Sequence, residues 1–307
     1  MIRRIFLASA SALALAGTAL AADLPTHAPP PVFLPPPPMW TGFYIGVNAG
    51  YDWSASNSAN VASAVAFNNA AVLSPTGLTY APAAALGATR SVPVKSNGFI
   101  GGGQIGYNYQ FATSWLVGIE ADIQGLAGSN SSTGVLSVVP RASPPAPAGL
   151  TAATNLFVSK SIDYLGTVRG RFGYLLTPTL LIYGDGGLAY GGIKSATGIF
   201  SAEVPNTGTT NAFGVGRAST TRVGWTAGGG AEWMFLPNWS AKIEYAYYDL
   251  GNVTYRDGPL VANLGGPAGP VAFINTAATR VHFNGNVVRA GINYHFNWGG
   301  APVVAKY

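Results

Sequence analysis

The sequence predicts an all-β fold: an eight-stranded antiparallel up-and-down transmembrane β-barrel with long extracellular loops. Three observations predict it. An export signal is followed by no apolar run of the ~18 residues that a spanning helix needs, eight segments alternate apolar and polar residues, and short and long connections alternate between them. Only 9% of the residues are charged, while 48% are hydrophobic and 12% aromatic. A cytosolic enzyme would carry about 25% charged residues.

Composition also narrows the chemistry. The 307 residues include no cysteine, which excludes disulfide scaffolds, thiolate metal sites and thiol catalysis. The net charge is +5, but the chain has no cluster of Lys and Arg of the kind that binds nucleic acid. We therefore expect no nucleic-acid partner. The spacing of the three histidines predicts no metal site, and we expect no cofactor.

Residues 1–21 have the features of a secretory signal peptide. Two arginines precede an apolar run over 5–20, and a small-x-small motif places cleavage between Ala21 and Ala22. An uncleaved anchor is the alternative, but the apolar run is short for one. We expect export through the Sec pathway. Residues 22–39 are rich in proline and predict a stiff periplasmic linker, a ligand for an aromatic groove being the less favoured interpretation.

The strands of the predicted barrel are eight segments with an apolar–polar period of two. They cover residues 41–53, 98–110, 115–126, 160–174, 179–191, 221–235, 239–249 and 286–297. In the first, Phe43 and Ile45 belong to the apolar face, and Tyr44 and Asp52 to the opposite one. A soluble β-sandwich alternates too, but it carries more charge in total. The scarcity of charge favours lipid as the outer solvent.

Aromatic residues on the apolar faces gather at the strand ends, as the interfacial girdles of a barrel do. At the expected periplasmic end they are Phe43, Tyr109, Phe111, Trp115, Phe172, Tyr174, Trp233, Phe235, Trp239, Tyr294 and Phe296. At the other end they are Tyr51, Trp53, Phe99, Tyr164, Tyr190, Trp225 and Tyr247. The core of a sandwich would instead spread its aromatics along the strands.

The lengths of the connections predict which end of the barrel faces the periplasm. Short turns lie at 112–114, 175–178 and 236–238, and long connections span 54–96, 127–159, 192–220 and 250–285. Outer-membrane barrels keep short turns in the periplasm and long loops outside. The composition of the long connections predicts mobility and no pocket. They also carry an excess of basic residues, which favours contact with lipopolysaccharide phosphates; plain solvated loops are an equal alternative.

Charged residues on the polar faces are expected to form a network in the lumen. They are Asp52, Glu120, Asp122, Asp163, Arg169, Arg171, Asp185, Arg222, Glu232, Lys242, Glu244 and Arg289. An eight-stranded interior is just wide enough for side chains to fill it, and an unpaired buried charge is costly. The favoured interpretation is a polar plug that specifies the fold. The alternative is a salt-bridge gate that admits water and small ions.

Several motifs are similar to those of the porin-like outer-membrane immunogenic proteins of alphaproteobacteria. They are 40–46 after the proline run, 101–109, 168–174 and the ending 288–298. This resemblance implies a small eight-stranded barrel like the transmembrane domain of outer membrane protein A. Residues 289–296 also resemble the signal by which the barrel assembly machinery recognises a last strand, with Arg289, Gly291, Tyr294 and Phe296 at its key positions. Eleven residues follow Phe296, a tail that the family shares.

Two further patterns match functional motifs without the structural context that those motifs need. Gly101–Gly106 and Gly184–Ala189 match dinucleotide-binding glycine motifs, but they lie inside alternating strands and not between a strand and a helix. His282 with Asp249 or Asp257 and a loop serine would form a catalytic site at the barrel rim. No nucleophile, base and orienting group can be grouped from the sequence, and no catalytic residue is assigned.

We therefore expect an integral protein of the outer membrane of a Gram-negative bacterium, not an enzyme. Its barrel covers 40–298 and a periplasmic tail covers 299–307. The favoured function is structural: envelope integrity, display of antigenic loops and contact with lipopolysaccharide. The alternative is a narrow passive channel for ions or small solutes. Expected partners are membrane lipid, lipopolysaccharide and the assembly machinery, and a monomer is favoured.

Overall fold

The computed structural model describes residues 40–66, 75–142, 148–205, 211–262 and 272–296. The expected signal peptide with its Ala21–Ala22 cleavage site, the linker 22–39 and the tail 299–307 lie outside the described residues. In the described part of the chain, no helix is both long enough and apolar enough to cross a bilayer.

The fold is almost entirely antiparallel β-structure. Its strands are β1 (Gly42–Ser54), β2 (Ser58–Val65), β3 (Arg90–Pro93), β4 (Gly98–Phe111), β5 (Trp115–Ala127), β6 (Ser131–Pro140), β7 (Thr151–Thr177), β8 (Leu180–Val204), β9 (Asn211–Leu236), β10 (Trp239–Ala262) and β11 (Ala272–Phe296). One described helix, α2 (Pro75–Ala88), follows β2. The glycine motifs at 101–106 and 184–189 lie within β4 and β8.

Eight strands close into a ring in the order β1-β4-β5-β7-β8-β9-β10-β11, and β11 pairs back onto β1. Closure is continuous from Phe43 opposite Phe296 to Ser54 opposite Gly285. The ring leaves no strand edge facing lipid, as a spanning sheet requires. We refer to this part, between the two aromatic girdles, as the membrane barrel. It confirms the predicted fold class.

The wall of the membrane barrel has the predicted polarity. Apolar side chains such as Val47 and Val223, each 66% exposed, point outward. The girdle residues meet across strands: Tyr51 lies 5.3 Å from Phe99 at one end, and Trp239 lies 5.2 Å from Tyr294 at the other, between ring centroids. Such aromatic pairs suit the two boundaries of the lipid layer.

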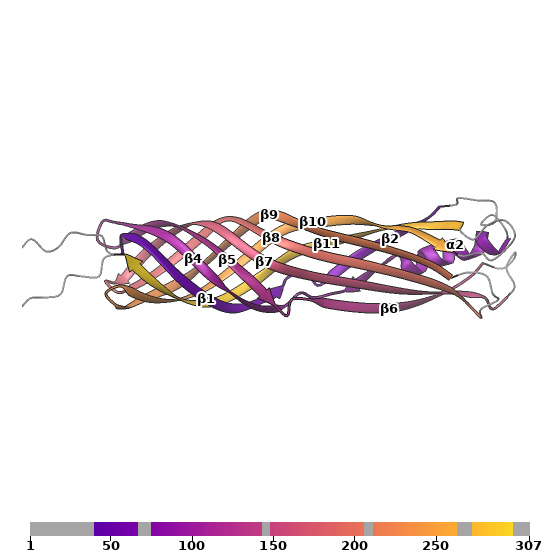
Figure 1. Cartoon of the computed structure of the whole chain (residues 1–307), viewed down its shortest axis with the longest axis horizontal. Coiled ribbons are helices and arrows are strands. Elements are labelled where there is room, and N and C mark those ends of the chain that lie inside the picture. The colour runs from indigo at the N-terminus through magenta and orange to yellow at the C-terminus, as the bar shows by residue number, and fades with distance from the viewer. Residues whose placement is uncertain (1–39, 67–74, 143–147, 206–210, 263–271, 297–307) are drawn as a thin grey trace, which may run out of the picture. The chain divides into compact units, whose positions relative to one another are not determined.

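Most of the long connections are sheet, which differs from the mobile loops expected at 127–159, 192–220 and 250–285. Strands β7 to β11 run 24 to 27 residues, against 13 or 14 in β1, β4 and β5. Beyond the membrane barrel, β7 pairs with β6 and β11 with β2, which pairs in turn with β3 (Figure 1). We refer to this continuation as the outer sheet.

The outer sheet has an apolar interior that helix α2 fills. Tyr80 and Ala84 of α2 are fully buried together with Leu156, Ile199 and Phe283 from the strands. Helix α2 contacts β2, β6, β7, β8 and β11, so the sheet curves around it. Burial of this apolar surface explains why the segments are ordered. The period-two pattern continues through 152–162, where alternate side chains face inward, but the many small and polar residues obscure it in the sequence.

Two irregularities change which residues face inward. A register shift between Ile162 and Tyr164 in β7 buries Ile162 and exposes Asp163. A second shift, between Asp249 and Asn252 in β10, is centred on Gly251 with φ of +79°. A bulge of this kind inserts a residue and reverses the alternation beyond it. A strict period of two therefore assigns residues to the wrong face of the sheet on the far side of each shift.

Candidate functional site: a charged lumen

Arg169 on β7 lies at the centre of the lumen and contacts four carboxylates. Its Nη2 donates to Glu120 at 2.6 Å and to Asp122 at 3.0 Å. Its Nη1 donates to Asp185 and to Glu244, both at 2.7 Å. All five side chains are fully buried. Alternation places these residues on the inner face of β5, β7, β8 and β10, so a single guanidinium ties four strands together.

Arg171, two residues further along the same face, connects the network to the periplasmic end. It donates to Glu232 at 2.7 Å and to the hydroxyl of Tyr44 at 2.6 Å. Tyr44 in turn donates to Glu120 at 2.7 Å. The guanidinium also lies 3.9 Å from the ring centre of Tyr183, a cation–π contact. The sequence placed Tyr44 on a polar, inward face without a role.

Lys242 and Arg289 supply the remaining cations. Lys242 donates to both oxygens of Glu120 at 2.8 Å, and Arg289 donates to Glu244 at 2.6 Å and to Asp122 at 2.9 Å. The network thus joins nine residues on six strands. Removing charges from water is expensive, and only this dense mutual pairing offsets the cost.

Three of the twelve expected lumen residues lie outside this network. Asp163 points outward because of the β7 register shift and pairs with exposed Lys194 at 2.7 Å. Arg222 is partly exposed and donates to the backbone oxygen of Asn252 at 3.2 Å. Asp52 is fully buried, but no ion pair among the described residues includes it. None of the three is a member of the network, and Asp163 also lies outside the lumen.

The lumen is closed on both sides of the network. At the periplasmic end Trp40 is 1% exposed, packs with Leu116, Leu181 and Met234, and donates its indole N–H to the oxygen of Pro178 at 3.0 Å. On the other side a void of about 10 Å³ lies between Arg289 and Tyr248. That volume is about the size of one water molecule. The apolar interior filled by α2 begins beyond it.

Lys160 links the membrane barrel to the outer sheet. Its ammonium donates to Ser54 Oγ at 2.9 Å and to the backbone oxygens of Ser56 and His282 at 3.0 and 2.9 Å. Burial lowers the pKa of Lys160 to about 8. All three ammonium protons have acceptors, so the residue joins β1, β7 and β11 at this level.

The possible rim site is only partly assembled. His282 Nε2 lies 2.9 Å from Asp249 Oδ1 on the outer face. Asp257 is not part of it, because it points into the outer sheet and accepts from Thr279 at 2.7 Å. In the part of the chain that the structure describes, no serine bonds to the His282 ring, and no three His, Cys, Asp or Glu residues form a metal-binding group.

The residues of the expected assembly signal lie on the last strand of the ring. Arg289 and Gly291 face the lumen, and the rings of Tyr294 and Phe296 face outward 5.1 Å apart, at the end of β11. The recognition role of these residues stays a prediction.

Comparison with known proteins gives the family. A model of the outer membrane protein beta-barrel domain matches residues 8–296. The chain belongs to this family. It is 32% identical over 302 residues to the 31 kDa outer-membrane immunogenic protein of Brucella melitensis, a match that covers 96% of this chain and 100% of the relative. It is 25% identical to the 25 kDa outer-membrane immunogenic protein of Brucella abortus, covering 83% and 87%.

Among solved structures, similarity extends to OprG of Pseudomonas aeruginosa, with 11% identity, a TM-score of 0.35 and coverage of 83% of this chain and 97% of that one. Ail of Yersinia pestis matches with 11% identity, a TM-score of 0.25 and coverage of 83% and 99%. As a member of the outer membrane β-barrel family, the protein resides in the outer membrane of a Gram-negative bacterium, as the sequence predicted.

Proposed function

We propose that this protein is a non-conducting structural protein of the cell surface, which strengthens the envelope and displays the outer sheet. The observation that carries the proposal is the filled interior. Nine charged side chains pair across the lumen, Trp40 covers one side, and α2 fills the other. Nothing in this arrangement favours the alternative of a passive channel, since an ion would have to displace several buried ion pairs at once.

The outer surface supports contact with anionic partners, lipopolysaccharide first among them. Eight of the ten acidic side chains in the described residues are buried, and the other two, Asp163 and Asp249, are paired with Lys194 and His282. Basic side chains remain exposed at the surface, Arg256 and Arg280 among them. Guanidinium and ammonium groups close to the outer leaflet suit lipopolysaccharide phosphates.

The barrel assembly machinery is the partner proposed for biogenesis. Tyr294 and Phe296 present their rings to the lipid side at the end of the strand that closes the ring. Both features support a role for this strand as a recognition element before closure.

The experiment compares cells that lack the protein with cells that express it again. If the role is structural, loss of the protein increases sensitivity to detergents and to large antibiotics, and leaves the uptake rate of small charged solutes within about twofold. Expression of the wild-type chain restores resistance. A fall in small-solute uptake without an envelope defect would instead favour the channel and overturn the proposal.

A further inference from the structure

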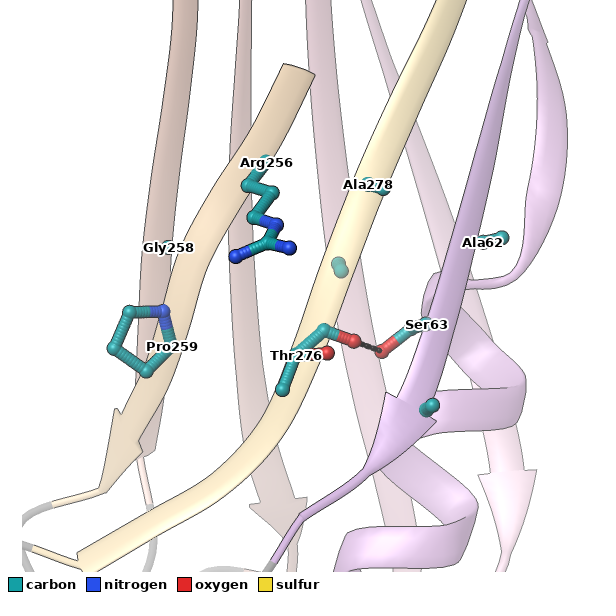
Figure 2. Close-up of a pocket in the computed structure, with 9 residues that line it drawn as sticks. Ala62, Ser63, Arg256, Gly258, Pro259, Thr276 and Ala278 are labelled. Atoms are coloured by element: carbon teal, nitrogen blue, oxygen red, sulfur yellow. Dashed lines mark hydrogen bonds between the residues drawn. The ribbon is translucent and has the colours of Figure 1, made fainter. Parts of the chain in front are cut away.

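A hollow of about 590 Å³ lies on the outer face of the outer sheet, across β10, β11 and β2. Its floor is made of small residues, among them Ala62, Ala64 and Ala278. Figure 2 shows the side chain of Arg256 extending from β10 into this space, with Thr276 on the neighbouring strand and Pro259 at the edge. The small floor leaves room for a ligand to approach the guanidinium closely.

A second guanidinium belongs to the same face. Arg256 lies opposite Ala278 in the β10–β11 register, and Arg280, two residues further along β11, lies opposite Thr254. Side chains two residues apart on a strand share a face, so the two arginines are diagonal neighbours. Both are exposed, and within the described residues neither forms a hydrogen bond or an ion pair. Arg256 thus lines the hollow, and Arg280 lies beside it on the same face of the sheet.

Carboxylates that could neutralise these arginines are turned away. Asp257 follows Arg256 directly, but its side chain is fully buried on the opposite face of the sheet, where Thr279 donates to it. Asp249, the other acid of β10 near this level, is bonded to His282. The arginines therefore keep their full attraction for an external anion, and the stiff strands hold their relative position.

The polar neighbours are hydroxyls and amides. Thr254 and Asn252 on β10 and Asn60 on β2 are exposed on the same face as Arg280, to which Asn60 is opposite. Ser63 donates to the backbone oxygen of Thr276 at 3.3 Å (Figure 2), which fixes β2 against β11 at the floor. A shallow hollow with hydroxyl and amide groups beside two guanidiniums suits a sugar that carries an anionic group.

The height of the hollow separates it from the lipid headgroups. Asn286 of β11 lies opposite Trp53 of the outer girdle, and Ala278 is eight residues further along β11. At about 3.3 Å per residue and a tilt of about 40°, this places the hollow roughly 20 Å beyond the girdle. Lipid phosphates belong at the girdle, so the ligand comes from the saccharide layer above it or from outside the cell.

We infer that Arg256 and Arg280 form a binding site for an anionic saccharide, one that carries phosphate, sulfate or carboxylate groups. The inference rests on the proposed function only in that the protein must face the saccharide layer. The site accepts the anionic group at the two guanidiniums, with the sugar over the alanine floor. The ligand has two possible sources: the core of lipopolysaccharide, or a soluble polysaccharide.

The test measures binding to the full-length mature protein, refolded in detergent, by isothermal titration. One probe is the phosphorylated core oligosaccharide released from lipopolysaccharide, compared with the same material after removal of its phosphates. The other is a heparin oligosaccharide, compared with its desulfated form. The variants are Arg256→Ala/Arg280→Ala and a control that removes the same charge elsewhere on the surface, Lys95→Ala/Arg217→Ala. Heat-modified gel mobility confirms that each variant is folded.

We expect the wild type to bind at least one anionic probe at least tenfold more tightly than its neutral form. The affinity of the Arg256→Ala/Arg280→Ala variant for that probe should fall tenfold or more. The affinity of the control variant should stay within twofold of the wild-type value. The probe that binds identifies the source. Binding of neither probe, or an equal loss in both double variants, would overturn the site. Either result leaves the envelope experiment unaffected, so this inference and the proposed function can fail separately.

Discussion

Arg289 and Glu244 lie directly opposite each other in the β10–β11 ladder, and the guanidinium donates through both Nε and Nη2 to one carboxylate oxygen, at 2.9 and 2.6 Å. This pair joins β10 to β11, the strand that closes the ring against β1, and both side chains are buried. The pair therefore stabilises the barrel only as long as both charges are present.

Replacing Arg289 with methionine should destabilise the protein by about 3–5 kcal/mol, because it leaves buried carboxylates short of a cation. The double variant Glu244→Gln/Arg289→Met should recover part of this loss. The control is Arg222→Met, which we expect to cost no more than about 1 kcal/mol, since that side chain contacts no carboxylate of the described residues. Denaturant unfolding in lipid vesicles measures all three. Equal losses at positions 289 and 222 would contradict the network.

Replacing Gly251 with alanine should destabilise the protein by about 1–2 kcal/mol, because φ at this position is +79° and a side chain is strained there. The control is Gly125→Ala in β5, where an added Cβ meets no atom within 4 Å. The same unfolding measurement applies. A tolerated Gly251→Ala would show that the bulge in β10 does not depend on the left-handed backbone.

The stability of the outer sheet should rise as the pH falls from 7.5 to 5. Burial raises the pKa of Asp257 from 3.8 to about 6, so the folded protein binds a proton that the unfolded chain does not bind between these values. The free energy of unfolding therefore rises by about 1 kcal/mol as the pH falls over this interval. This stabilisation is absent at pH values above the pKa of Asp257 in the folded protein. The measurement is the thermal midpoint across the pH range.

The variant Asp257→Asn isolates this effect. The unfolding midpoint of the variant should lack the pH dependence that Asp257 gives to the wild type. The difference in midpoint between the two proteins should therefore shrink as the pH falls. A difference that stays constant from pH 7.5 to 5 would show that Asp257 is not the titrating group.

Replacing Phe296 with alanine should lower the amount of folded protein in the outer membrane several-fold, because the last strand would lose an aromatic residue of the proposed assembly signal. Refolding of the same variant in detergent should be close to normal. Phe43→Ala is the matched control, since Phe43 lies opposite Phe296 in the same girdle. A similar loss in cells for both variants would mean that only packing at the girdle matters.

Much of the membrane barrel could be predicted from the sequence. Lipid outside and a packed polar lumen inside impose one rule on every strand: apolar residues that face outward alternate with polar residues that face inward. That rule places Glu120, Arg169 and Glu244 in the lumen, where they form buried ion pairs. It fails at Asp163 and Arg222. A register shift reverses the alternation at Asp163. The guanidinium of Arg222 is bonded to the backbone oxygen of Asn252, at the β10 bulge.

The outer sheet could not be predicted in the same way. Its interior is apolar and its exterior mixed, so the contrast between faces is weak. Inward residues there include Ser195, Thr197 and Thr279, which are buried because hydroxyls bond to one another and to Tyr255. Segments rich in such polar residues are usually predicted to be loops. The helix α2 contributes to the core only because the strands around it already exist, which is a tertiary effect.

Single-channel recording in a planar bilayer tests most directly whether the charged network closes the lumen. The mature wild-type chain, shown to be folded by heat-modified mobility, would be inserted beside a large open porin as the positive control. We expect the porin to give conductance steps and this protein to give none across the full voltage range. Reproducible steps that change in Glu244→Gln/Arg289→Met would contradict the account and identify the lumen as an ion path.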